Sequence, residues 1–247
     1  MAVTAPPRPG RNLPWPVEFY KSAVGKKWVM AITGIILLGF VFAHMIGNLK
    51  VYIGFLPAEG AFEIDIYGEA LRRLLFPILP EYAALWLLRI GLIAAFVLHL
   101  HSAYTLTVMN RRARQVDYQG PRNYLAANYA SRTMRWTGII VLFYIAWHLA
   151  DFTLGVDGIA PDGWEYGAIY DNFILSFSRV PVAILYIVAN LALGVHIFHG
   201  AWSMFQSLGV NNPKFNAWRR YFAIAFAAVI VIGNVSFPIA VLTGIVS

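Results

Sequence analysis

Five long apolar runs limit what this chain can fold into more than any other feature of its sequence. They cover about residues 28–49, 83–109, 134–154, 179–208 and 221–246. A helix that crosses the hydrocarbon core of a bilayer needs roughly 20 mostly apolar residues, and each run meets this length. Because lipid offers the backbone no hydrogen-bond partner, each run is expected to be an α-helix. We therefore predict an all-α membrane protein, with residues 1–247 forming a single transmembrane domain of five bundled helices.

The composition supports this class and excludes several others. The chain is 59% hydrophobic and 13% charged, whereas soluble domains have roughly 45–50% apolar and about 25% charged residues. It has no cysteine, which excludes disulfides, thiolate-bound iron–sulfur clusters and c-type haem attachment. No phosphate loop, dinucleotide-binding glycine pattern or Ser/His/Asp constellation stands out, so no catalytic residue is predicted. We expect no cleaved signal peptide, soluble domain, internal repeat or linker.

The distribution of charge predicts the orientation of the chain. The N-terminal arm and the loops 110–135 and 209–220 together carry fourteen basic and two acidic residues. The loops on the other side carry five basic and ten acidic residues. By the positive-inside rule, the N-terminus is cytoplasmic and the C-terminus lies outside the cell membrane. We interpret the net charge of +7 as topogenic, with lipid and not nucleic acid as the partner.

All six histidines fall within apolar runs, and four of them fall at two depths. An imidazole in hydrocarbon is costly unless something binds it, so it marks a functional site by default. At 1.5 Å per helical residue, His44 and His148 lie about 20–25 Å from the inner ends of their runs, whereas His99 and His196 lie about 16–18 Å from theirs. Two opposed imidazoles from facing helices are what a six-coordinate b-type haem requires. The pattern predicts a bundle that encloses two stacked b-type haems.

Two of the runs carry a second histidine, and helical periodicity helps to choose between them. His99 and His101 are about 200° apart around a helix, so only one of them faces the core. Ala103 follows His99 by one turn and leaves room for a flat macrocycle, as Gly200 does after His196. We predict His99 and His196 as iron ligands, with His101 and His199 as alternative ligands or as groups that support the ligands.

Two other functions remain open at this point. A proton channel or transporter could use the histidines as a relay without haem, and it would need ionisable residues along one path. A haem-free structural anchor could use single histidines for hydrogen bonds between helices.

Four segments resemble a known family. SAVGKKWVMAITGIILLGFVFAHMIGN, LHLHSAYTLTVMNRRAR, TMRWTGIIVLFYIAWHL and HIFHGAWSMFQSLGVNNPKF are similar to the single-chain, five-helix, di-haem cytochrome b subunit of succinate dehydrogenase and fumarate reductase complexes. The resemblance implies His44 and His148 as ligands of the distal haem. It also implies that the proximal haem is bound by His99 and His196, with Gly200 four residues after the latter.

The resemblance also implies partners and a role. The family anchors a flavoprotein subunit and an iron–sulfur subunit, which perform the dicarboxylate chemistry. Electrons pass between the iron–sulfur clusters and a membrane quinone, typically menaquinone, by way of the two haems. The direction of electron flow and the assembly of several complexes into an oligomer stay open.

Further candidates surround the two haem levels. A two-proton reduction of quinone near the outer haem would need protonatable groups, and we name Glu63, Asp65, Glu69 and Asp151. The family places basic and hydroxyl groups at helix ends for the haem propionates, which here are Lys27, Arg132, Arg135 and Ser203. The first of the two outer loops contains EIDIYGEALRRLL, whose apolar spacing predicts a short interfacial helix.

Overall fold

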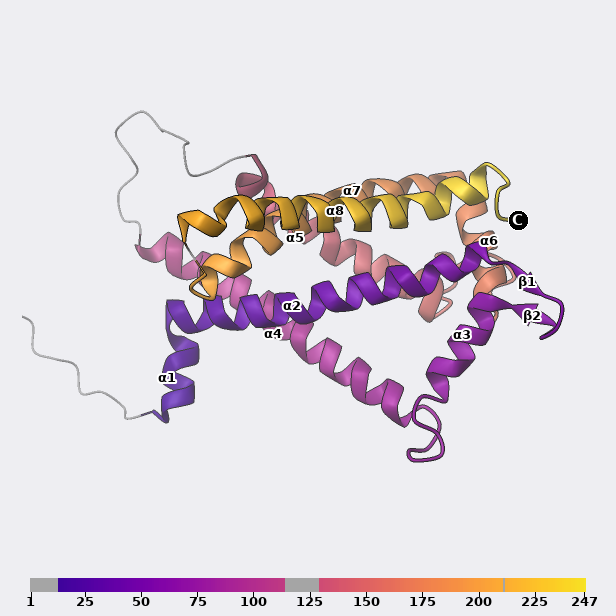
Figure 1. The fold of residues 1–247 in the computed structure, drawn as a ribbon, viewed down its shortest axis with the longest axis horizontal. Coiled ribbons are helices and arrows are strands. Elements are labelled where there is room, and N and C mark those ends of the chain that lie inside the picture. Colours follow the sequence, from indigo (N-terminus) through magenta and orange to yellow (C-terminus); the bar gives the residue numbers. More distant parts are fainter. Residues whose placement is uncertain (1–12, 114–128, 211) are drawn as a thin grey trace, which may run out of the picture.

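The computed structural model describes residues 13–113, 129–210 and 212–247. Within these ranges, five helices are long and apolar enough to cross a membrane, and they form one bundle (Figure 1). This confirms the prediction of an all-α membrane protein. The helices are α2 (Ala23–Asn48), α4 (Ala83–Ala113), α5 (Tyr129–His148), α7 (Val180–Ser207) and α8 (Pro213–Leu242). The 3₁₀ turn η1 (Leu49–Tyr52) extends α2, and the π-helical turn η2 (Leu149–Thr153) extends α5.

Several of these helices begin before the apolar run that predicted them. Helix α2 starts at Ala23, where Ser22 Oγ accepts a hydrogen bond from the backbone N of Gly25 at 2.9 Å. Helix α8 starts at Pro213, and the side chain of Asn212 accepts from the backbone N of Lys214. Capping side chains set a helix start, whereas hydropathy marks only the part that lies in lipid. Helices α2 and α8 are therefore longer than their apolar runs.

Shorter elements cover the two ends of the bundle. They are α1 (Trp15–Lys21), the antiparallel hairpin of β1 (Phe55–Leu56) and β2 (Ala61–Phe62), α3 (Glu63–Arg72) and α6 (Ile169–Ser178). Helix α3 is the short helix predicted between the first two spans. The hairpin, α1 and α6 were not predicted. Each is too short for its hydrophobic pattern to stand out, and each depends on tertiary contacts.

The end that carries the hairpin, which we call the hairpin end, is held together by polar and aromatic contacts. Asp65 Oδ1 accepts hydrogen bonds from the backbone N of Ile169 at 2.7 Å and of Tyr170 at 3.0 Å, and so caps α6. The rings of Phe62 and Tyr170 stack with centroids 3.6 Å apart. The Tyr170 hydroxyl donates to the backbone oxygen of Ser247. These contacts join the hairpin and α3 to α6, and α6 to Ser247.

Glycines allow three of the spans to approach closely. Gly194 on α7 faces Val231 on α8, and Gly233 on α8 faces Met45 on α2. A methyl group at either glycine would overlap the facing side chain. Small residues are what membrane helices use for close packing, because lipid provides no hydrophobic force to press helices together. The two glycines therefore fix α8 against α7 and α2.

One expectation was wrong, because the chain does contain a short internal repeat. MAITGIILLGFVFAH at residues 30–44 aligns without gaps to MRWTGIIVLFYIAWH at residues 134–148. Seven of the fifteen positions are identical, namely Met, Thr, Gly, two Ile, Leu and the final His. The repeated stretches lie on α2 and α5, which pack against α4 and α7 respectively. The pair α2 and α4 thus corresponds to the pair α5 and α7.

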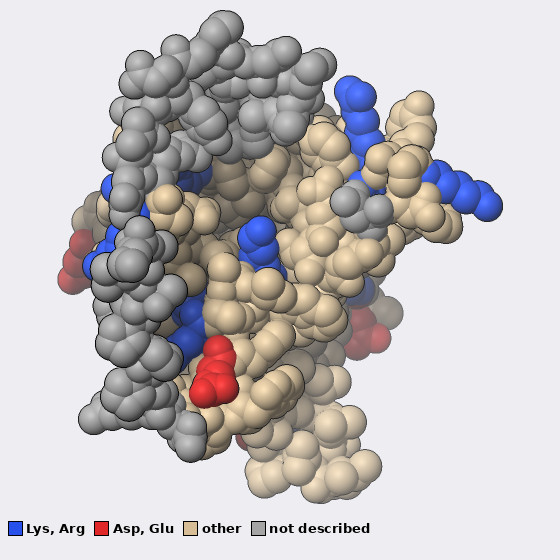
Figure 2. Space-filling view, turned by 90° about the vertical axis from the view of Figure 1, so that its left-hand side faces the viewer, with Lys and Arg blue, Asp and Glu red and all other residues tan. Residues whose placement is uncertain are grey.

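The two ends of the bundle differ in charge. The end formed by α1, the starts of α2, α5 and α8, and the last turns of α4 and α7 is called here the basic end. In the view onto this end, most of the visible charged side chains are basic (Figure 2). Glu18 is its single acid among the described residues, whereas the hairpin end carries ten acids.

Removing the cap of α6 should loosen the hairpin end. We expect Asp65→Ala to cost about 1 kcal/mol, the usual value of a helix cap, and to lower the melting temperature by roughly 2–4 °C. Asp65→Asn keeps a side-chain oxygen and should lose less. Thermal unfolding of the purified protein in detergent measures the effect. Glu59→Ala, at an exposed hairpin acid, is the control, and equal losses in Asp65→Ala and Glu59→Ala would contradict the capping role.

Candidate functional site

His44 and His148 face one another across the bundle. His44 lies in the last turns of α2, and His148 is the last residue of α5. Their ring centroids are 5.8 Å apart, and the ring planes are nearly perpendicular at 83°. The Nδ1 atom of His44 is 3.2 Å from the side-chain amide of Asn48, and that of His148 is 3.4 Å from the Tyr186 hydroxyl. The structure brings together the pair that was predicted for the outer level.

His99 on α4 and His196 on α7 lie at a second level of the bundle, nearer the basic end, and are called here the inner pair. Each of them lies over a glycine of the neighbouring helix. A Cβ added at Gly34 would be 3.6 Å from Cε1 of His99, and one added at Gly138 would be 3.3 Å from Cε1 of His196. The repeat therefore supplies each of these histidines with a glycine surface.

The other two histidines lie in different surroundings. His101 is exposed, its ring stacks on that of Tyr20, and its Nδ1 hydrogen-bonds the Tyr20 hydroxyl. His199 has a buried Nδ1 atom without a partner among the described residues. Ala103 and Gly200, the small residues predicted to make room one turn from the ligands, are both half-buried. The surroundings of His101 and His199 thus differ from those of the four histidines at the two levels.

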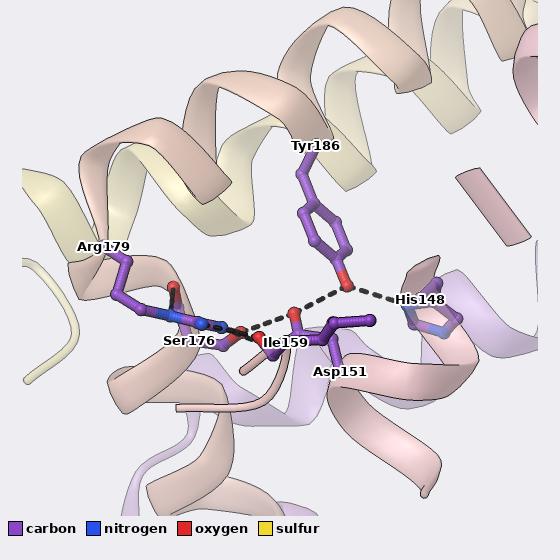
Figure 3. Close-up of polar contacts among 6 residues, drawn as sticks. All are labelled: His148, Asp151, Ile159, Ser176, Arg179 and Tyr186. Carbon is purple, nitrogen blue, oxygen red and sulfur yellow. Dashed lines mark hydrogen bonds and ion pairs between the residues drawn. The ribbon is translucent and has the colours of Figure 1, made fainter. Parts of the chain in front are cut away.

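Asp151 lies at the centre of a buried polar cluster beside His148 (Figure 3). Its side chain is fully buried, and it forms an ion pair with Arg179 at 2.6 Å. Ser176 Oγ donates to Asp151 Oδ2 at 2.6 Å, and the Tyr186 hydroxyl donates to the same oxygen at 2.9 Å. Tyr186 therefore connects the carboxylate to the imidazole of His148. The cluster joins the third span, α6 and α7 at the hairpin end.

The π-helical turn η2 carries Asp151 into this cluster. The backbone N of Leu154 bonds to the oxygen of Leu149, five residues earlier, at 2.8 Å. Such wide turns are rare and occur often at functional sites. Sequence reasoning placed Asp151 just beyond His148, and it missed Tyr186, Ser176 and the pairing role of Arg179. The available signals were an arginine at the very start of a span and a tyrosine one to two turns inside it.

The other three acids that were predicted near the outer level have partners of their own. Glu63 pairs with Lys50 at 2.5 Å, and Asp65 caps α6. Glu69 pairs with Arg72 and Arg73 and is half exposed. None of these contacts reaches a histidine, so Asp151 is the predicted acid that the structure connects to one.

The basic end differs in detail from what was predicted. Lys27 and Arg135 are exposed, and Ser203 Oγ donates to the backbone oxygen of Gly200 at 3.2 Å. The side chain of Arg132 lies outside the described residues. Two other bases are buried instead. Lys26 is 6% exposed with its ammonium 4.0 Å from the centroid of the Tyr20 ring, and Arg219 is 1% exposed.

Several buried polar atoms near the inner pair have no hydrogen-bond partner within the described part of the chain. They lie on α4, α7 and α8, between the inner pair and the basic end, and are Ser102 Oγ, His199 Nδ1, Trp202 Nε1 and Arg219 Nε. Buried polar groups are almost always hydrogen-bonded, so each such atom calls for an explanation. Three of the four belong to hydroxyl, indole and guanidinium groups that can donate. They suit a ligand that offers acceptor oxygens, such as carboxylates.

Comparison with protein families decides the class of the chain. Residues 110–235 match the model of the succinate dehydrogenase/fumarate reductase transmembrane subunit, which covers half of the chain. The chain belongs to this family. It is thus a multi-pass membrane subunit of the succinate dehydrogenase/fumarate reductase class. No curated protein and no solved structure matches the chain significantly.

The residues of this transmembrane subunit offer the donor types that haem takes from a protein. The ring centroids of His44 and His148 are 5.8 Å apart, and imidazole is a common ligand of haem iron. His99 and His196 would supply two further imidazoles at the second level. The unpaired donors of Ser102, Trp202 and Arg219 suit carboxylates such as haem propionates.

The ion pair of the transmembrane subunit's buried cluster can be tested by a double-mutant cycle. Arg179→Gln leaves the buried carboxylate of Asp151 without its counter-charge, and we expect a loss of about 2 kcal/mol. This is less than the 3–5 kcal/mol of a fully buried pair, because the Arg179 side chain is 31% exposed. The melting temperature in detergent should fall by roughly 4–8 °C.

Removing both charges together should restore part of this stability. Asp151→Asn keeps groups that can bond to Ser176 and Tyr186, so Asp151→Asn combined with Arg179→Gln should melt above Arg179→Gln alone. Glu69→Gln, in a half-exposed ion pair, should shift melting little. If the loss of stability in the double variant equals the sum of the losses in Asp151→Asn and in Arg179→Gln, the two residues are not coupled.

Proposed function

We propose that the chain is the di-haem cytochrome b membrane anchor of a succinate:quinone oxidoreductase. In this role it carries electrons between an iron–sulfur partner subunit and a membrane quinone, with menaquinone as the expected type. The observation that carries the proposal is the arrangement of His44 with His148 and of His99 with His196 at two levels of one bundle. Membership of the transmembrane-subunit family supports it.

Bound haem would supply two one-electron carriers at different depths of the membrane. The residues of the chain would then bind and orient these groups. Four histidines would provide the axial nitrogens, and Gly34 and Gly138 let the inner imidazoles lie close to the neighbouring helices. Lys26, Arg219, Ser102 and Trp202 are the described residues that we assign to the propionates of the inner haem, in place of the exposed Lys27 and Arg135.

The charges of the two ends support an orientation and a docking face. By the positive-inside rule, the excess of bases at the basic end supports a cytoplasmic position for that end. We propose that the iron–sulfur and flavoprotein subunits dock there, next to the inner level. The hairpin end, with the C-terminus, then lies outside the cytoplasmic membrane.

Proton handling is assigned to Asp151 among the four acids considered. A quinone that is reduced by two electrons near the outer level takes up two protons, and these need a group that can hold or pass them. Asp151 is connected through the Tyr186 hydroxyl to His148 and through Arg179 to the surface. Glu63, Asp65 and Glu69 have partners that support a structural role instead.

Haem content tests the proposal directly. The chain, purified with its partner subunits, should contain two b-type haems in a pyridine haemochrome assay and in reduced-minus-oxidised spectra. His44→Ala or His148→Ala should remove one haem, and His99→Ala or His196→Ala should remove the other, because each haem loses an axial ligand. His101→Ala and His199→Ala should retain both haems.

The outcomes separate this function from the alternatives. A purified complex without haem would favour the histidine-relay channel or the structural anchor. Loss of the same haem in His44→Ala and in His196→Ala would refute the pairing. Loss of one haem in His101→Ala would assign the α4 ligand to His101 instead of His99.

A further inference from the structure

Thr33 on α2 contacts the imidazole of His99. Its Oγ1 lies 3.2 Å from His99 Nδ1, and the threonine is 5% exposed. The same hydroxyl donates to the backbone oxygen of Val29 at 2.7 Å. One turn of α2 therefore presents a hydroxyl oxygen to this histidine.

The second copy of the repeat presents the same groups to His196. Thr137 Oγ1 lies 3.4 Å from His196 Nδ1, and the threonine is 7% exposed. Its hydroxyl donates to backbone oxygens of its own helix, at 3.1 Å to Thr133 and at 3.0 Å to Met134. The arrangement thus occurs twice, on two helices with a shared sequence pattern.

The direction of these hydrogen bonds follows from counting protons. A threonine hydroxyl has one proton, and in both copies a helix carbonyl accepts it. In each copy a carbonyl oxygen lies closer to Oγ1 than the imidazole does, at 2.7 Å against 3.2 Å for Thr33 and at 3.0 Å against 3.4 Å for Thr137. We therefore assign the hydroxyl proton to the carbonyl and the proton of the imidazole contact to Nδ1 of His99 and of His196. A neutral imidazole that is protonated at Nδ1 has its lone pair at Nε2. Nε2 is then the nitrogen that is free to bind a metal.

We propose that Thr33 and Thr137 are positioning residues that fix the tautomer and the ring orientation of His99 and His196 for iron binding at Nε2. This inference rests on the proposed function and adds to it two residues outside the ligand set. An acceptor at Nδ1–H also raises the basicity of a ligating imidazole. A more basic ligand favours the ferric state, so the two threonines lower the reduction potential of the inner haem.

Hydroxyl bonds to helix carbonyls are common for threonine within helices, and alone they assign no role. Thr107 on α4 makes such a bond, to the backbone oxygen of Ala103 at 2.8 Å. Among the described residues, no imidazole is hydrogen-bonded to Thr107. Thr33 and Thr137 differ from Thr107, because the Nδ1 atom of a histidine lies within hydrogen-bond distance of each Oγ1 atom. In both copies the next residue is a glycine over which the imidazole lies. The sequence Thr-Gly therefore serves as a surface for the ring and an acceptor for its proton.

The reduction potentials of the two haems test this role in the complete complex. Thr33→Val and Thr137→Val keep the shape of the side chain and remove the acceptor. In each variant we expect the reduction equilibrium of the inner haem to shift threefold to tenfold toward the ferrous state. For a one-electron couple this is a rise of roughly 30–60 mV. Redox titration followed by the haem absorbance bands measures it, and the outer haem should not change.

Matched variants separate positioning from packing. Thr33→Ser and Thr137→Ser keep the hydroxyl and should restore the wild-type potential, whereas Thr107→Val should leave both potentials unchanged. If the valine variant releases the inner haem while the serine variant retains it, the role is also supported. Unchanged potentials in both valine variants, or equal effects of valine and serine, would overturn the inference. A wild-type complex that contains no haem would instead overturn the proposed function on which it rests.

Discussion

The absence of water from the bilayer core is the constraint on which this structure depends. An imidazole placed there must find a partner for each of its nitrogens, because an unsatisfied polar group in hydrocarbon costs several kcal/mol. Each of the four paired histidines has a polar partner at Nδ1, from Asn48, Thr33, Tyr186 or Thr137. The chain thus satisfies one nitrogen of each of these histidines from within.

The two levels are built in different ways. The inner level lies against a neutral surface of threonine, glycine and helix carbonyls, and it is repeated on two helices. The outer level is connected through Tyr186 to a buried carboxylate and its arginine. The ring of Phe177 packs against those of Phe173 and Tyr186. Histidines therefore lie against a neutral surface at one level and beside charged groups at the other.

The sequence predicted the architecture better than it predicted the details of the site. Hydropathy alone was sufficient for the five spans, because the length of a membrane helix is a physical necessity. The depth of the histidines predicted which of them would meet. The buried cluster could not be predicted, because a wide turn after His148 shifts the register of the residues that follow, and a periodicity argument assumes regular turns. The sequence could not predict that Lys26 would be buried and Lys27 exposed. The two lysines are neighbours at the end of a span, and only the packing of the bundle decides which face of the helix is covered.

The division of contacts between the two halves has a consequence for how the chain is made. His44 and His99 find their Nδ1 partners, Asn48 and Thr33, within the first two spans. His148 and His196 find theirs on the spans that follow. Proteins emerge N-terminus first during synthesis, so the first helical pair can rest in the bilayer with its imidazoles satisfied before the second pair exists. His44 meets His148 only when the second pair arrives, so under the proposed function haem insertion would be a late step of biogenesis that proceeds from a stable half.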